Sequence, residues 1–470
     1  MRLSGISGLY TDYYELTMAQ GYFLSGKKDD TAVFDYFFRV NPFDGGYVIF
    51  AGLDTLLEAL SRFVYGEQDR AYLRERAFTE AFLAFLKDFR FRGTICSVRE
   101  GEVVFPQEPL VRVEGTIIEC QLIETLLLNV LNFESLIATK ASRVRRAAGD
   151  RPVSDFGLRR AQGMGGLQAS RAAVIGGVDA TSNVLAGQRC RLPVAGTQAH
   201  SWVQSFDDEL AAFRAYARLY PDNTILLVDT YDTLHSGLPN AILVGLELKE
   251  AGQTLKAVRL DSGDLAYLSK QARRMLDEAG LTETKILASN QLDEYLIRSL
   301  NEQQAPIDGF GVGTELVTGK TTAALDGVYK LAAYNGQPTL KLSNTLEKIS
   351  LPGKKETRRY FNGAGKFYAD CVCLVDEGSP EEMAHPFERD KHCALRGLAS
   401  EPLQKPVMEG GEIISRETDV IAMREYGRKR LAFLPEEHKR FEMPHIYKVG
   451  LSPRLEGMRD EVIKGLSVKF

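Results

Sequence analysis

The sequence of 470 residues has no apolar stretch long enough to cross a membrane. Its longest apolar runs, such as 126–133, are interrupted by charge or asparagine, whereas a membrane helix needs about 20 apolar residues. The net charge is only −5, which gives no general reason to expect a nucleic acid or a membrane surface as a partner. We therefore expect neither partner, and any basic site must be local.

Cysteine is also scarce, with six residues scattered along the chain and no signal peptide ahead of them. This pattern argues against a disulfide framework and predicts a reducing, cytoplasmic location. Internal repeats and low-complexity tracts are absent from the sequence. What is present is 44% hydrophobic and 26% charged residues, the composition of a globular protein with two or three domains.

Short β-like runs recur after residue 149, with helical patterns in most of the gaps. They lie at 152–156, 192–195, 224–229, 256–261, 285–289 and 308–312. This spacing is typical of strand–helix units wound on a parallel sheet or barrel. We predict an α/β fold, with an irregular, TIM-like barrel as its centre.

Changes in the residue pattern along the chain predict three domains. Residues 1–148 form an N-terminal α+β domain that ends in a long helix from about 119 to 148, and residues 149–342 form the catalytic barrel. The barrel part ends in a hairpin marked by Asn335-Gly336, a strong turn signal. Residues 343–470 form a C-terminal extension that packs back on the N-terminal domain.

Polar residues follow nearly every expected strand of the barrel, a pattern that packing does not require. In chain order they are Asp155, Arg159 and Arg160; Thr197 and His200; Asp229 and Asp232; Arg259, Asp261 and Asp264; Ser289 and Asn290; and Gly311, Gly313 and Thr314. Strands of a barrel end at one face, where such folds carry their active sites. We therefore expect these side chains to meet.

Each group has its own chemistry, and each has a plain structural alternative. Glycines late in a barrel can hold phosphate, although glycine there is often only a turn. Arginines such as Arg259 can fork onto phosphate or carboxylate oxygens, although single arginines are more often salt-bridged. Asp261 and Asp264 could bind Mg²⁺ through oxygen, but Asp264 fits better as a helix cap.

His200 lies in the segment 196–206, G-T-Q-A-H-S-W-V-Q-S-F, which holds the only tryptophan. A lone histidine is more often structural than functional, but Asp229 could orient this one and raise its basicity. Phosphate anchors, a divalent metal, arginines and one histidine together suit the transfer of a phosphorylated sugar from a diphosphate leaving group.

The same residues carry a resemblance to a known family. Eight ordered blocks, at 9–23, 127–144, 155–163, 181–187, 196–206, 228–233, 259–265 and 310–318, are together similar to nicotinate phosphoribosyltransferases. The likeness covers about residues 9–335. It implies an enzyme that makes nicotinate mononucleotide and pyrophosphate from nicotinate and phosphoribosyl pyrophosphate, the entry step of NAD salvage. It also implies coupling to ATP hydrolysis through a phosphorylated histidine, which would be His200.

The resemblance also assigns the substrate contacts. The pyridine ring would stack between Phe156 and Tyr14 of a partner subunit, so we expect a homodimer with shared active sites. Arg159 would face the ring's carboxylate or the sugar phosphate. Arg259 would serve the ribosyl diphosphate together with Asp261, which would also hold Mg²⁺.

Three glycine-motif residues, Gly311, Gly313 and Thr314, would cradle the 5′-phosphate. Ser182 takes the place of an aspartate found in nicotinamide-specific relatives. Serine removes the repulsion of a nicotinate anion, so the resemblance favours nicotinate; the alternative is that Ser182 only caps the next helix. His200, Asp229 and Asp261 would be the catalytic residues.

The chain departs from the family at two places. Many relatives read S-G-D-L-D-E-Y where this chain has A-S-N-Q-L-D-E-Y at 288–295, so a metal or ribose contact there would fall to Asn290 or be lost. Some relatives carry zinc near the C-terminus, where this chain has Cys371, Cys373, His385, His392 and Cys393. This spacing is not that of a standard finger, so zinc is the less favoured interpretation.

Two kinds of alternative remain. The same fold could use nicotinamide or quinolinate, but Ser182 argues against the first and the His200 motif against the second, whose enzymes do not use ATP. The chain could instead be a catalytically silent relative that binds nucleotides or acts as a scaffold. A scaffold has no need of His200, Asp229, Arg259 and Asp261 together, so we favour the ATP-coupled nicotinate enzyme.

Overall fold

The structure is a computed structural model that describes residues 6–343, 349–388 and 390–467. By its internal contacts the chain divides into two compact units. Unit 1 combines Met1–Thr139 with Ala324–Phe470, and unit 2 is Lys140–Ala323. The three-domain division expected from the sequence stays a prediction.

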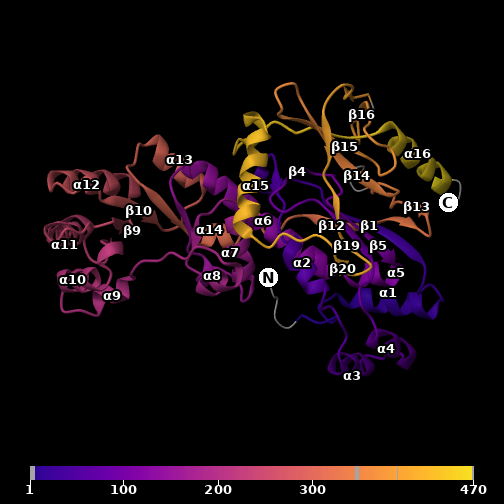
Figure 1. Ribbon diagram of the computed structural model, residues 1–470, viewed down its shortest axis with the longest axis horizontal. Helices are drawn as coiled ribbons and strands as arrows, with labels where there is room; N and C mark the ends of the chain where they lie inside the picture. The colour runs from indigo at the N-terminus through magenta and orange to yellow at the C-terminus, as the bar shows by residue number, and fades with distance from the viewer. Residues whose placement is uncertain (1–5, 344–348, 389, 468–470) are drawn as a thin grey trace. The chain divides into compact units, whose positions relative to one another are not determined.

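Unit 2 is built on a six-stranded sheet in the order β7-β6-β11-β10-β9-β8, in which all neighbours are parallel (Figure 1). The strands are β6 Val153–Asp155, β7 Ala180–Thr181, β8 Ile225–Leu227, β9 Ala257–Leu260, β10 Lys285–Ser289 and β11 Gly309–Val312. The mixed α/β fold is confirmed, while closure into a barrel stays a prediction.

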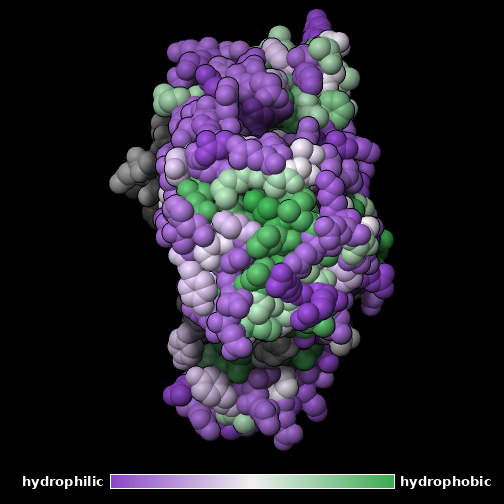
Figure 2. Space-filling model, turned by 90° about the vertical axis from the view of Figure 1, so that its left-hand side faces the viewer, coloured by the Kyte–Doolittle hydropathy of each residue, from purple (hydrophilic) through white to green (hydrophobic). Residues whose placement is uncertain are grey.

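Helices connect these strands, as the strand–helix spacing predicts. They are α7 Gly165–Ile175, α8 Val184–Cys190, α9 His200–Gln204, α10 Glu209–Leu219, α11 Leu238–Glu250, α12 Leu265–Glu278, α13 Glu294–Glu302 and α14 Thr314–Val317. The Asp264 carboxylate accepts from Tyr267 N at 3.0 Å, so its predicted role as the cap of α12 is confirmed. Figure 2 faces the side on which α10, α11 and α12 lie, where hydrophilic residues surround a hydrophobic area.

One of the six expected strands is wrong. Residues 192–195 contribute only a single bridge, from Val194 to Thr181. The second strand of unit 2 in chain order is instead β7. Proline has no amide hydrogen to donate to a ladder, and Pro193 stands inside the expected strand. The pairing therefore stops after one bridge.

Unit 1 holds two large sheets. The first has the order β13-β12-β1-β5-β3-β19-β20 and only antiparallel neighbours. Its strands are β1 Thr31–Phe38, β3 Thr94–Ser97, β5 Val111–Thr116, β12 Gly327–Tyr334, β13 Gln337–Pro338, β19 Lys405–Glu409 and β20 Glu412–Ile413. Asn335 and Gly336 have φ values of 46° and 75° between β12 and β13, so the predicted hairpin is confirmed.

The second sheet has the order β17-β16-β21-β15-β14-β18. Its strands are β14 Lys355–Phe361, β15 Phe367–Leu374, β16 Glu382–Ala384, β17 His392–Ala394, β18 Ser400–Pro402 and β21 Val449–Leu451, and a separate pair joins β2 Val48–Ile49 to β4 Val103–Val104. The main helices are α1 Tyr13–Leu24, α2 Leu53–Leu60, α3 Glu67–Glu75, α4 Glu80–Lys87, α5 Ile117–Leu122, α6 Glu124–Ala148, α15 Val420–Phe433 and α16 Pro453–Ser467. Among the described residues, none of the helices has the length and apolar content to cross a bilayer.

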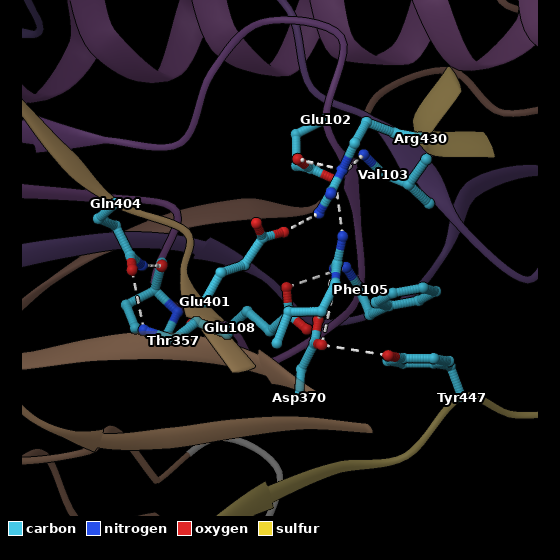
Figure 3. A network of polar contacts seen from close by, with 12 residues as sticks. Glu102, Val103, Phe105, Glu108, Thr357, Asp370, Glu401, Gln404, Arg430 and Tyr447 are labelled. Carbon is cyan, nitrogen blue, oxygen red and sulfur yellow. Dashed lines mark hydrogen bonds and ion pairs between the residues drawn. The ribbon is translucent and has the colours of Figure 1, made fainter. Parts of the chain in front are cut away.

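A buried polar network joins early and late segments of unit 1 (Figure 3). Arg359, which is fully buried, donates to Asp370 at 2.5 and 2.9 Å and to Glu102 at 2.6 Å. Arg430 on α15 donates to the same Glu102 at 2.9 Å, and the Tyr447 hydroxyl donates to Asp370 at 3.1 Å. Each of these buried charges has an opposite charge beside it, as burial requires.

Candidate active site

The polar groups at the strand ends of unit 2 lie in two neighbourhoods, the first of which is at β6 and β11. Asp155 is fully buried, and its carboxylate accepts from Gly157 N at 2.8 Å, Ser170 Oγ at 2.8 Å and Thr181 Oγ1 at 2.7 Å. With these three hydrogen bonds, the Asp155 carboxylate stabilises the turn that follows β6. Phe156 N donates to Val312 O at 2.8 Å, which continues the β6–β11 pairing and fixes the aromatic residue at the sheet edge.

The ring of Phe156 explains one of the glycines. A Cβ at position 311 would lie 2.4 Å from Phe156 Cε2, which is impossibly close, so only glycine leaves room for the ring there. Gly313 precedes the short helix α14, and the exposed Thr314 begins it. Their expected contacts with phosphate stay predictions.

His200 lies in the second neighbourhood, at β8 and β9, as the first residue of α9. Its Nδ1 is 3.2 Å from Thr230 Oγ1, and its Nε2 is 3.7 Å from Asp261 Oδ2. Asp261 is thus the carboxylate beside His200, where the sequence led us to expect Asp229. Thr230 was missed, although its place directly after Asp229 in V-D-T-Y-D marks it as a strand-end residue.

Asp229 instead holds the backbone of the next strand end. Its Oδ2 accepts from Asp261 N at 2.9 Å and from Ser262 Oγ at 2.6 Å. Its Oδ1 is buried and has no hydrogen-bond partner within the described part of the chain. Ser289 Oγ donates to Asp261 Oδ1. Asp229, Asp261, Ser289 and His200 are therefore brought together as predicted, but Asp229 acts on Asp261 rather than on the imidazole.

Arg259 connects the two neighbourhoods. Its Nη1 donates to Thr197 Oγ1, and its guanidinium lies 5.9 Å from the centre of the Phe156 ring. Burial lowers the pKa of Arg259, partly offset by the carboxylates of Asp261 and Asp229. The Arg259 Nε–H is buried and no described residue accepts from it, whereas Arg159 is exposed in the short turn Leu158–Arg160.

The residue that caps α8 tests the alternative interpretation of Ser182 as a helix cap. Asn183 Oδ1 accepts from Ala186 N at 3.1 Å, so Asn183 and not Ser182 caps this helix. Ser182 N donates to Asp155 O at 2.8 Å, and its side chain is half-buried beside the first neighbourhood. The interpretation of Ser182 as the cap of this helix is therefore wrong.

Three other sequence candidates have surroundings of their own. Asp232 caps the turn that follows it, accepting from Leu234 N at 3.0 Å and His235 N at 2.8 Å. Asn290 is exposed and has a φ of 88°. Tyr14 lies on α1 of unit 1 and is 48% exposed. Burial, and then the negative charges of Glu124, Glu15 and Asp12, raises the pKa of the Tyr14 hydroxyl.

The C-terminal cysteines do not form a recognisable metal site. Cys371 and Cys373 are buried on β15, and burial raises the pKa of both thiols, that of Cys373 to about 12. Across residues 6–343, 349–388 and 390–467, no group of three or more His, Cys, Asp or Glu side chains could hold a metal ion.

Three polar side chains of the site region carry buried atoms that have no partner among residues 6–343, 349–388 and 390–467: Arg259 Nε, Asp229 Oδ1, and both amide atoms of Gln198. Burying such atoms without hydrogen bonds costs free energy, and a ligand can supply the missing partners. Sequence reasoning missed Gln198, although it lies in the segment 196–206 that holds His200. The region therefore has the donors and acceptors of a site for a polar, charged small molecule.

Comparisons with known proteins agree with this chemistry. Family models for the nicotinate phosphoribosyltransferase N-terminal domain, family and C-terminal domain match residues 9–132, 152–364 and 354–459. Nicotinate phosphoribosyltransferase of Bacillus subtilis is 42% identical, with 94% of this chain and 92% of the relative covered. The human enzyme is 34% identical, with 98% and 97% covered.

Solved structures give the same result. Human nicotinic acid phosphoribosyltransferase aligns with a TM-score of 0.87 and 32% identity over 96% of this chain and 99% of that one. A nicotinate-nucleotide pyrophosphorylase from Pyrococcus furiosus aligns with a TM-score of 0.73 and 23% identity over 92% and 98%, which shows a shared fold alone. The chain belongs to the nicotinate phosphoribosyltransferase family and is an enzyme of this type.

Proposed function

We propose that this protein forms nicotinate mononucleotide and pyrophosphate from nicotinate and phosphoribosyl pyrophosphate in NAD salvage, with ATP hydrolysis coupled through phosphorylation of His200. The observation that carries the proposal is the set of buried, unpartnered polar atoms at the strand ends beside His200, on Arg259 and Asp229. An enzyme that binds a sugar diphosphate needs such groups, whereas a silent scaffold would keep them at a cost in stability.

The pyridine ring stacks on Phe156, whose position is fixed by its backbone bond to Val312. Arg159 faces the nicotinate carboxylate or the sugar phosphate. Ser182 favours nicotinate, because a serine hydroxyl can donate to a carboxylate and does not repel it. Tyr14 of a second copy covers the other face of the ring, so the working enzyme is a homodimer with shared sites. The exposure of Tyr14, 48%, leaves it available for this contact.

The sugar diphosphate is held by cationic and backbone groups. Arg259 serves the diphosphate, and Gly311, Gly313 and Thr314 surround the 5′-phosphate. The unpartnered Asp229 Oδ1 and the carboxylate of Asp261 are the hard oxygen ligands that Mg²⁺ prefers, together with substrate phosphates. When bound, Mg²⁺ supplies positive charge that stabilises the leaving pyrophosphate.

In the transfer step the ring nitrogen of nicotinate forms a bond to C1′ of the sugar as the bond from C1′ to the pyrophosphate oxygen breaks. Positive charge develops at C1′ and negative charge on the leaving oxygen. Arg259 lies beside the ring of Phe156, where a fixed cation can stabilise that oxygen without reorganising in the transition state.

His200 couples this step to ATP. One of its ring nitrogens forms a bond to the γ-phosphorus as ADP leaves, and water later cleaves the P–N bond to release phosphate. Thr230 Oγ1 lies within hydrogen-bond distance of His200 Nδ1, and Asp261 Oδ2 lies 3.7 Å from its Nε2, so the ring is oriented for the reaction. Phosphorylation tightens binding of the sugar diphosphate, and hydrolysis releases the product.

The test compares His200→Ala with His235→Ala, a histidine whose side chain is 85% exposed. We expect His200→Ala to lose nicotinate-dependent ATP hydrolysis and to retain slow transfer without ATP. The control variant should keep ATP stimulation. Unchanged ATP stimulation in His200→Ala would exclude the phosphohistidine.

The shared site is tested by mixing subunits. Tyr14→Ala and His200→Ala homodimers should each be impaired, and mixed dimers should regain activity because one of their two sites has both native residues. No recovery in verified mixed dimers would mean that each subunit completes its own site. We expect the enzyme to act in the cytoplasm, with small molecules as its substrates.

A further inference from the structure

Gln198 is the most unusual of the buried polar residues near His200. Its side chain is 5% exposed, and neither Nε2 nor Oε1 has a hydrogen-bond partner among the described residues. Its neighbour Thr197 accepts from Arg259, and His200 follows two residues later. The amide therefore belongs to the segment that is anchored at the strand-end site.

Two other buried amides, those of Asn183 and Gln404, are satisfied. Asn183 accepts from Ala186 N at 3.1 Å and donates to Gly166 O at 3.2 Å. Gln404 accepts from Thr357 N at 2.8 Å and donates to Pro109 O. A buried amide that lacks both kinds of partner destabilises the free protein, so Gln198 is costly unless a ligand completes it.

The hydrogen-bonding groups of the Gln198 amide limit which ligand group can pair with it. An amide offers hydrogens through Nε2 and lone pairs through Oε1, so its ligand must both accept and donate. The carboxylate of nicotinate and the oxygens of the diphosphate only accept and would leave Oε1 unpaired. A sugar hydroxyl does both.

We propose that Gln198 is a substrate-binding residue whose amide hydrogen-bonds a ribose hydroxyl of the phosphoribosyl substrate. The inference rests on the proposed function, because it assumes a sugar diphosphate at this site. The Arg259 Nε–H, which has no partner among the described residues, supplies a further donor in the same region, as recognition of an anionic sugar requires.

The test uses Gln198→Leu, which has a similar volume and removes both orphaned atoms. We expect its thermal midpoint to rise by a few degrees in the absence of ligand, because the unsatisfied amide is gone. We expect KM for phosphoribosyl pyrophosphate to rise about tenfold, since that is the effect of losing the hydrogen bonds of one polar group. KM for nicotinate and for ATP should change less than about twofold.

Gln204→Leu is the matched control, because Gln204 is exposed on α9, and it should change neither quantity. A lower midpoint in Gln198→Leu, or an unchanged KM for phosphoribosyl pyrophosphate, would overturn the inference. A rise confined to the KM for ATP would overturn it too, since it would place the ribose of ATP there instead.

Calorimetric binding of phosphoribosyl pyrophosphate separates this inference from the proposed function. If the parent protein has no turnover of nicotinate but binds the sugar diphosphate, and Gln198→Leu loses that binding, the proposed function fails and Gln198 is still a ligand residue. If the parent turns over nicotinate and the variant binds the sugar diphosphate equally well, only the Gln198 inference fails.

Discussion

The substitution Glu108→Gln should stabilise unit 1 at neutral pH. Glu108 is fully buried beside Asp370 in the polar network (Figure 3). Its Oε2 accepts from Phe105 N at 3.3 Å, and its Oε1 accepts from none of the residues that the structure describes. The two buried arginines are already balanced by Glu102 and Asp370, so an ionised Glu108 would add an unpaired negative charge.

Burial, and then the charge of Asp370, raises the pKa of Glu108 well above its ordinary range. The folded chain therefore holds a proton that the unfolded chain releases above about pH 4.3. Since the folded pKa is the higher one, stability is greatest below the unfolded pKa and falls as pH rises toward the folded pKa. The loss is about 1.4 kcal/mol for each pH unit in that window.

A glutamine cannot ionise, can donate to Asp370 and can accept from Phe105 N. The thermal midpoint of Glu108→Gln should therefore exceed that of the parent by an amount that grows from pH 5 to pH 8. Glu412→Gln, an exposed position, is the control for loss of one charge and should track the parent. A Glu108→Gln protein that is less stable than the parent at pH 8 would refute the reasoning.

Two further predictions concern substrate binding. Gly311→Ala should force Phe156 to move, because the new Cβ would meet the ring at 2.4 Å, and should raise KM for nicotinate about tenfold or more. Gly196→Ala, whose Cβ would have open space, should leave KM for nicotinate unchanged. Equal effects of the two substitutions on KM would exclude the contact between Phe156 and the pyridine ring. Ser182→Asp should weaken nicotinate about tenfold by charge repulsion and improve nicotinamide in competition assays, whereas an unchanged preference would remove Ser182 from the ring site.

Much of unit 2 could be predicted from sequence because its strands are short apolar runs that end in polar residues. Five of the six expected strands are present at about the expected positions. The prediction of a strand at 192–195 was wrong because it rested on apolar character alone and ignored that Pro193 has no amide hydrogen. The strand β7 was missed because it has only two residues, Ala180–Thr181, too few to form a pattern.

The grouping of several strand-end residues could be predicted from the sequence, and the contacts among them could not. Convergence of strand ends follows from topology, so His200, Asp229, Arg259, Asp261 and Ser289 could be grouped in advance. Which carboxylate lies beside the imidazole depends on side-chain direction, and Asp261 rather than Asp229 lies there. Gln198 could not be found from sequence, because only the packed structure reveals a buried amide without partners.

The most direct test of the account is product formation from phosphoribosyl pyrophosphate with nicotinate or nicotinamide, each with and without ATP. We predict that nicotinate mononucleotide forms, that ATP stimulates its formation, and that nicotinamide is a poor substrate. Preferred turnover of nicotinamide would contradict the role of Ser182. No turnover of either would contradict the proposed function and favour a catalytically silent relative.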